Sequence, residues 1–237
     1  METELLYFND SYLREFEATV LEVNNNKYII LDKTAFYYGT GGQPYDTGSM
    51  IKEGEEYKVV FVGKFDGKVS HGVDRPGLKA GDKVKCVIDW QRRYTLMKYH
   101  TAAHILSKII FTEAGAVTSG NQLGIDGSRI DFTLEKFDKE KVQGWIDETN
   151  EIIEKKLPVK IEQMPREEAL KIPDFIRTKA NLLQDIPVLR IVNIEGFDMQ
   201  ACGGTHVKNL GEIGQIELVK TENKGKDNRR IYFKLKN

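Results

Sequence analysis

The segment from Trp90 to Ala114 constrains the fold of this chain most, because it contains neither proline nor glycine. Asp89 precedes it as an N-cap residue, and Gly115 follows it as a residue that favours a helix C-terminus. The segment therefore predicts one long α-helix. The sequence patterns before and after it differ, so we expect two domains, residues 1–90 and 91–237.

Residues 1–90 show short apolar stretches separated by turn residues, which is typical of β structure. Strands are predicted at Ala18–Val23, Lys27–Leu31, Tyr57–Val62, Val69–Val73 and Val84–Ile88. Many short strands at this spacing predict a small β-barrel or curled sheet. A glycine-rich segment, Gly39–Gly48, interrupts the strand pattern.

Residues 91–237 combine helices with strands. After the long helix, a second helix is predicted at Asp138–Lys156, where apolar residues recur at helical spacing. Strands are predicted at Arg129–Leu134, Val159–Gln163, Val188–Ile194, Gln215–Val219 and Arg230–Leu235. The expected fold class is α+β, with a small barrel first and then helices on one face of a mostly antiparallel sheet.

Composition limits the location and the partners of the protein. No apolar run approaches the roughly 20 residues that span a bilayer, and acidic residues occupy the N-terminus where a secretion signal needs basic ones. We therefore expect a cytoplasmic protein with no membrane partner. The two cysteines, Cys86 and Cys202, argue against a disulfide scaffold. The net charge of -1 means that RNA binding would need locally concentrated basic residues.

Two short motifs hold three of the four histidines and one of the two cysteines. His100 and His104 lie four residues apart in the predicted long helix, so both imidazoles can reach one ion. Cys202 and His206 bracket Gly203-Gly204-Thr205, a segment that can bend sharply. Three imidazoles and one thiolate suit tetrahedral zinc, so we predict one zinc ion per chain.

The first motif also excludes one class of enzyme. Zinc peptidases place a glutamate directly after the first histidine of such a helix, whereas this chain has Thr101. Four protein ligands normally form a closed structural site, so a structural zinc and a catalytic zinc both remain open.

Five motifs, in order along nearly the whole chain, resemble the editing domain of alanyl-tRNA synthetase and its freestanding AlaX relatives. They are His100-Thr101-Ala102-Ala103-His104, Cys202-Gly203-Gly204-Thr205-His206, the glycine-rich segment with Phe36-Tyr37 ahead of it, Asp89-Trp90-Gln91-Arg92-Arg93, and Ser128-Arg129-Ile130-Asp131-Phe132. One departure is Ala103, where synthetases commonly carry a second threonine.

The resemblance implies a fold and an activity. The fold is a small barrel followed by the α+β editing domain shared with threonyl-tRNA synthetase. The activity is trans-editing, the hydrolysis of the ester that links a wrong amino acid, chiefly serine and also glycine as a candidate, to the acceptor end of tRNA(Ala). A barrel with a glycine-rich loop resembles the medium-length AlaX type.

Other site residues are predicted around the metal. The catalytic candidates are Thr40, Gln43 and Gln122, of which Gln122 is the nearest match to the catalytic glutamine of the synthetase. The substrate-binding candidates are Thr34, Gly41, Gly42, Arg92 and Arg93. A polar group must read the hydroxyl of serine, because size alone cannot exclude the smaller alanine. The glycine-rich loop is alternatively a simple turn between strands.

Two rival functions remain on the sequence alone. One is a non-catalytic tRNA-binding module with a structural zinc, and the other is a metal-dependent hydrolase of a small ester or amide.

Overall fold

The computed structural model describes residues 2–136, 138–172, 175, 177 and 186–236. The chain forms two compact units, Met1–Thr95 and Leu96–Asn237. The division falls inside the long helix α1 (Trp90–Ala114) rather than ahead of it. The reason is that the first turn of α1 is bonded to the N-terminal unit, where Arg92 donates to the carbonyl of Tyr45.

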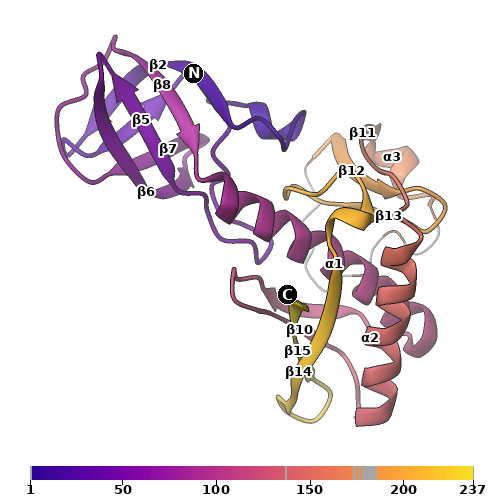
Figure 1. Cartoon of the computed structure of the whole chain (residues 1–237). Coiled ribbons are helices and arrows are strands. Elements are labelled where there is room, and N and C mark those ends of the chain that lie inside the picture. The colour runs from indigo at the N-terminus through magenta and orange to yellow at the C-terminus, as the bar shows by residue number, and fades with distance from the viewer. Residues whose placement is uncertain (1, 137, 173–174, 176, 178–185, 237) are drawn as a thin grey trace. The chain divides into compact units, whose positions relative to one another are not determined.

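The N-terminal unit is built on a closed antiparallel barrel with the strand order β2-β3-β7-β6-β5-β8, so the barrel prediction is confirmed (Figure 1). The barrel strands are β2 (Glu15–Asn24), β3 (Tyr28–Leu31), β5 (Gly48–Lys52), β6 (Glu55–Phe65), β7 (Lys68–Val73) and β8 (Lys83–Ile88). A short parallel pair, β1 (Glu4–Leu5) and β4 (Lys33–Thr34), and a 3-10 turn, η1 (Leu6–Phe8), complete the unit.

Side-chain alternation explains why these segments close into a barrel. In β2, Phe16, Ala18 and Val20 are buried, and the residues between them are less so. Inward-facing residues of neighbouring strands, such as Met50 and Val62, are fully buried in the same core cluster. This period of two matches the pleat of a strand, so one face of each strand forms the barrel core.

His71 and Thr34 form a closed hydrogen-bond pair inside the barrel. Nδ1 of His71 lies 3.0 Å from the carbonyl of Ile29, which can only accept, so Nδ1 carries the proton. The Thr34 hydroxyl therefore donates to Nε2 of His71 at 2.8 Å, and it accepts from the backbone N–H of Phe36 at 3.1 Å. Thr34 is fully buried. Its hydroxyl is thus bonded within the N-terminal unit, and its part in substrate binding stays a prediction.

The buried imidazole makes the barrel sensitive to acid. Burial lowers the pKa of His71 from 6.5 to about 4. Between these values the unfolded chain binds a proton and the folded chain does not, so stability is present above pH 6.5 and is lost as the pH falls to about 4. Each pKa unit is worth about 1.4 kcal/mol, so the loss approaches about 3 kcal/mol.

Denaturation of the His71→Gln variant at a series of pH values checks this expectation. The variant should be less stable at pH 7 and should lose less stability than the wild type between pH 6.5 and 4. An unchanged pH dependence would show that His71 does not carry the effect.

The C-terminal unit contains two antiparallel sheets with the orders β14-β15-β10-β9 and β11-β12-β13. The strands are β9 (Thr118–Gln122), β10 (Ser128–Phe132), β11 (Val159–Pro165), β12 (Val188–Ile194), β13 (Asp198–Ala201), β14 (Gln215–Asn223) and β15 (Arg229–Lys236). The remaining elements are α2 (Lys139–Glu154), the short helix α3 (Arg166–Ala169) and the 3-10 turn η2 (Leu210–Glu212). The α+β class is confirmed.

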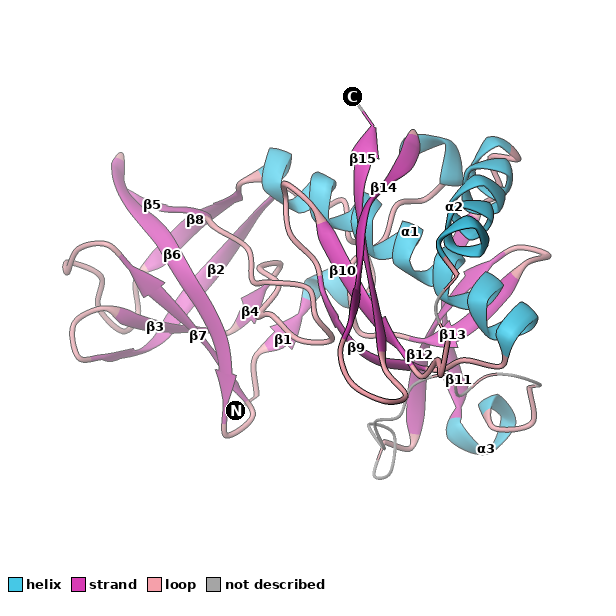
Figure 2. Ribbon diagram, turned by 90° about the horizontal axis from the view of Figure 1, so that it is seen from below, coloured by secondary structure: helices cyan, strands magenta, loops and turns pink. Residues whose placement is uncertain are grey.

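Helices α1 and α2 contact the four-stranded sheet (Figure 2). The hydroxyl of Tyr99 on α1 accepts from the N–H of Leu235 on β15 at 3.1 Å. Asn150 on α2 exchanges two hydrogen bonds with the backbone of Ile216 on β14. Helix α1 has the predicted bounds, and α2, predicted at Asp138–Lys156, spans Lys139–Glu154 with Asp138 as its N-cap.

Among the described residues, no helix combines the length and apolar character needed to cross a membrane.

Candidate metal centre

Helix α1 presents two histidines on one of its faces. His100 and His104 are one turn apart, and their ring centroids lie 5.3 Å from each other. Both are buried, together with the surrounding Ala102, Ala103 and Ile105. The small alanines within the motif and the i, i+4 spacing let both imidazoles project into one space.

The second pair of side chains comes from the segment that follows β13. The backbone N–H of Cys202 donates to the carbonyl of Arg190 at 3.0 Å, and Nη1 of Arg190 donates to the carbonyl of Cys202 at 2.6 Å. These two bonds hold Cys202 against β12. The N–H of Gly204 lies 3.4 Å from the Cys202 sulfur, and His206 follows as a buried residue.

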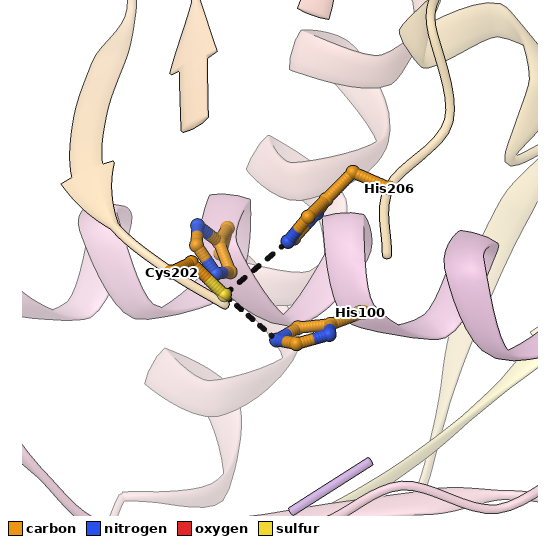
Figure 3. Close-up of side chains that lie close together, drawn as sticks. His100, Cys202 and His206 are labelled. Carbon is orange, nitrogen blue, oxygen red and sulfur yellow. Dashed lines mark hydrogen bonds between the residues drawn. The ribbon is translucent and has the colours of Figure 1, made fainter. Parts of the chain in front are cut away.

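The four side chains converge, as the sequence predicts. The Cys202 sulfur lies 3.5 Å from Nε2 of His100 and 3.4 Å from Nε2 of His206, as Figure 3 shows. One ligand atom from each of His100, His104, Cys202 and His206 lies within 4.8 Å of the others. Ligands at about 2.0–2.3 Å from a tetrahedral zinc ion are separated by roughly 3.5 Å, so the spacing is that of a tetrahedral site.

Burial keeps the three histidines of the cluster neutral, which is the form that binds a metal ion. It lowers the pKa of His100 to about 3, with a smaller contribution from Arg190. Burial and the neighbouring imidazoles also hold the pKa values of His104 and His206 well below their usual range. Neutral imidazoles have a lone pair to donate. Burial raises the pKa of the Cys202 thiol, so a metal ion must displace its proton when it binds.

The cluster also leaves a polar atom without a bond. Nδ1 of His104 is buried and has no hydrogen-bond partner among the described residues. An unsatisfied buried nitrogen is rare and needs a physical reason. A set of three imidazoles and one thiol, closely spaced and buried, fits a four-coordinate metal ion better than it fits a packed core.

Two predicted substrate-binding residues, Arg92 and Arg93, are engaged within the N-terminal unit. Nε and Nη2 of Arg92 both donate to the carbonyl of Tyr45, at 3.2 and 3.1 Å. Arg93 is fully buried and forms an ion pair with Asp46, which is also fully buried. Arg93 therefore anchors the loop, and the predicted part of Arg92 and Arg93 in substrate binding stays a prediction.

The glycine-rich loop begins with a tight turn. The N–H of Gln43 donates to the carbonyl of Thr40 at 3.0 Å, and Gly41 and Gly42 between them have φ values of 56° and 83°. Both glycines adopt the left-handed conformation that other residues rarely adopt. Thr40 and Gly41 are exposed, whereas Gln43 is buried. These residues belong to the N-terminal unit, so their part in a site with the metal cluster stays a prediction.

Gln122, the third catalytic candidate, lies at the end of β9 in the C-terminal unit. Its side chain is exposed, and its Oε1 accepts from Nε of Arg129 at 3.1 Å. Its catalytic role also stays a prediction.

A second buried ion pair, in the C-terminal unit, was not predicted from the sequence. Nη2 of Arg177 lies 2.6 Å from Asp198 and 3.1 Å from Oε1 of Gln200. Asp198 and Gln200 share a face of β13, because alternate strand residues share a face, and Cys202 follows directly after the strand ends at Ala201. The alternation of Asp198, Gln200 and Cys202 was the available signal.

Known families match both parts of the chain. Residues 5–92 match the family model described as tRNA synthetases class II (A). Residues 189–232, which include Cys202 and His206, match the model described as the Threonyl and Alanyl tRNA synthetase second additional domain.

Relatives that match nearly the whole chain identify its family. It is 50% identical over 242 residues to the alanyl-tRNA editing protein AlaX-M of Methanosarcina mazei, covering 98% of this chain and 96% of the relative. It is 44% identical to AlaX-M of Saccharolobus solfataricus, with 99% of each chain covered. Over 98% of its length it is 37% identical to the alanine--tRNA ligase of Pyrococcus furiosus, of which it covers 26%. The chain therefore belongs to the AlaX-M family of alanyl-tRNA editing proteins.

Proposed function

We propose that this protein is a freestanding, zinc-dependent deacylase that removes serine from mischarged tRNA(Ala), with glycine as a second candidate. The observation that carries the proposal is the convergence of His100, His104, Cys202 and His206 within 4.8 Å, in a chain matched end to end by alanyl-tRNA editing proteins. The acceptor end of the tRNA is the partner that this chemistry requires.

The reaction is the hydrolysis of an ester at the 3′-terminal adenosine. It needs a positioned water molecule and donors for the charge that develops on the carbonyl oxygen. A bound zinc ion would supply Lewis acidity toward the water or the ester carbonyl at a fifth coordination position, or at one that a ligand vacates. The chain itself supplies neutral imidazoles, a thiolate, and a setting from which bulk water is largely excluded, because three of the four ligands are buried. A low local dielectric strengthens each of these interactions.

Discrimination against alanine requires a polar group that binds the serine hydroxyl. Such a site can reject an analogue that lacks the hydroxyl by factors on the order of 10⁴ to 10⁵. Thr34 is engaged with His71, so the remaining candidates are Thr40, Gln43 and Gln122.

The hairpin formed by β14 and β15 is rich in lysine and arginine, but carboxylates pair with several of its lysines. Lys220 and Lys224 both pair with Glu222, and Lys234 pairs with Glu217. These carboxylates offset the positive charge that phosphate binding needs. Of the lysines of the hairpin, none is proposed as a phosphate contact on the present geometry.

Incubation of the zinc-loaded protein with seryl-, glycyl- and alanyl-tRNA(Ala) tests the proposal. Rapid loss of serine with retention of alanine is expected. Tight binding without hydrolysis would instead support a tRNA-binding module with a structural zinc, which the four-ligand set favours as the alternative. Hydrolysis of small esters with no response to tRNA would support a small-molecule hydrolase, and either result would overturn the proposal.

Replacing Gly41 by alanine is expected to slow serine removal by roughly ten- to a hundredfold, if the glycine turn lies against the aminoacyl end. A Cβ at Gly41 would meet no atom within 4 Å, so only a backbone strain of about 1–2 kcal/mol is introduced. Gly81→Ala is the matched control, because Gly81 also has a positive φ and equally open surroundings. The measurement is the single-turnover rate with seryl-tRNA(Ala). Equal rates for the two variants would mean that the turn is only structural.

A further inference from the structure

Thr101 connects the two halves of the metal cluster. It lies on α1 directly after His100, and it is fully buried. Its hydroxyl donates to the carbonyl of Met97 at 3.0 Å. The same oxygen lies 3.1 Å from Nδ1 of His206 and 3.3 Å from the backbone N–H of Val207. A helix residue thus holds the segment that carries the fourth ligand.

The hydrogen-bond inventory decides which nitrogen of His206 carries the proton. A hydroxyl has one proton and two lone pairs, and the proton of Thr101 is donated to Met97. The oxygen then accepts from Val207 and from His206, which requires a proton on Nδ1 of His206. Nε2 of His206 is left with its lone pair, and this is the atom that lies 3.4 Å from the Cys202 sulfur.

We propose that Thr101 is a positioning residue for the metal site, which fixes His206 in the Nδ1-protonated form so that Nε2 points its lone pair at the ion. This inference rests on the proposed metal site and names the outer contact that orients one of its ligands. Hydrogen bonds to the second nitrogen of a metal-bound histidine fix its tautomer and its ring orientation. Thr101 stands where a zinc peptidase has its glutamate, and here it orients a metal ligand instead.

Zinc affinity of three variants, measured by competition with a chelator, tests the proposal. Thr101→Val keeps the shape of the side chain and removes the hydroxyl, so zinc should dissociate about 10- to 100-fold more readily. Thr101→Ser keeps the hydroxyl and should bind zinc within a few-fold of the wild type. Thr149→Val is the matched control, because the buried Thr149 hydroxyl donates at 2.7 Å to the carbonyl four residues earlier, in α2, and contacts no histidine.

A second readout follows the proton itself. In the zinc-loaded wild type and in Thr101→Ser, nuclear magnetic resonance should show a slowly exchanging proton on Nδ1 of His206. In Thr101→Val that proton should exchange rapidly with solvent. This readout does not depend on activity and would not change if Thr101 only stabilised the helix.

The outcomes separate this inference from the proposed function. If Thr101→Val binds zinc as tightly as the wild type, the positioning role is wrong while the metal site stands. The same holds if Thr101→Ser loses as much zinc affinity as Thr101→Val. If Thr149→Val loses as much zinc affinity as Thr101→Val, the effect is one of general stability and the positioning role is again wrong. If the wild type binds no zinc, the proposed function itself fails.

Discussion

Cys202→Ala is expected to lose its bound zinc and to deacylate seryl-tRNA(Ala) about a thousandfold more slowly than the wild type, a loss of about 4 kcal/mol of transition-state stabilisation. The Cys202 sulfur lies 3.5 Å from Nε2 of His100 and 3.4 Å from Nε2 of His206. Without the thiolate, three neutral ligands remain and the ion loses its only negatively charged partner. Zinc content by elemental analysis and the single-turnover rate are the two measurements.

The second cysteine, Cys86, provides the control for this experiment. Cys86 is the only other cysteine, and it is fully buried in the barrel core of the N-terminal unit. Cys86→Ala should keep both zinc and activity, with only a small loss of stability from packing. Full zinc content and an undiminished rate in Cys202→Ala would contradict the proposed site.

Asp46→Asn is expected to destabilise the N-terminal unit by about 3–5 kcal/mol, because it leaves the Arg93 guanidinium buried without a counter-charge. Both side chains are fully buried, and Arg93 donates through Nε to Asp46 at 2.9 and 3.0 Å. Arg93 also donates to the carbonyls of Ser11 and Ala35, and Asp46 accepts from the N–H of Tyr37. The pair thus ties α1 to both ends of the glycine-rich loop.

Chemical denaturation followed by tryptophan fluorescence measures this loss. Of the two tryptophans, Trp90 lies in the N-terminal unit and Trp145 in the C-terminal unit, so a Trp145→Phe background reports on the N-terminal unit alone. Glu15→Gln is the control, because it breaks the exposed pair with Lys85 and should change stability little. The double variant Asp46→Leu with Arg93→Met should recover much of the loss. A single Asp46→Asn variant as stable as the wild type would contradict the role of this pair.

Features that depend on residues close together in the sequence were predicted correctly. Helix α1 has the predicted bounds, because Asp89 caps it by accepting from the N–H of Arg92 and Gly115 ends it in the left-handed conformation. The metal cluster was also found from sequence, since the i, i+4 spacing of His100 and His104 needs only a helix to bring the two side chains together.

Strands with weak apolar patterns were missed. The residues of β9 (Thr118–Gln122) are polar or glycine, and β13 (Asp198–Ala201) is short, with polar and apolar residues in equal number. Such segments become strands because a neighbouring strand offers backbone hydrogen bonds, as β10 does for β9. Tertiary pairing of this kind overrides local propensity and leaves no signal in a single sequence.

Bonds to partners that are distant in the sequence were not predicted. Arg93 was expected at an RNA surface, but its partner Asp46 lies 47 residues away in the sequence. Thr34 was expected near the substrate, but its hydroxyl donates a hydrogen bond to His71, which lies 37 residues away in the sequence. A single sequence shows the charge or the hydroxyl, whereas burial and partner are properties of the fold.

X-ray absorption at the zinc edge of the purified protein tests the central claim most directly. The account predicts one zinc ion per chain, with three nitrogen ligands at about 2.0–2.1 Å and one sulfur ligand at about 2.3 Å, from His100, His104, His206 and Cys202. The sulfur signal should vanish in Cys202→Ala and persist in Cys86→Ala. A protein without zinc, or zinc bound with no sulfur neighbour, would contradict the claim that these four side chains form the metal site.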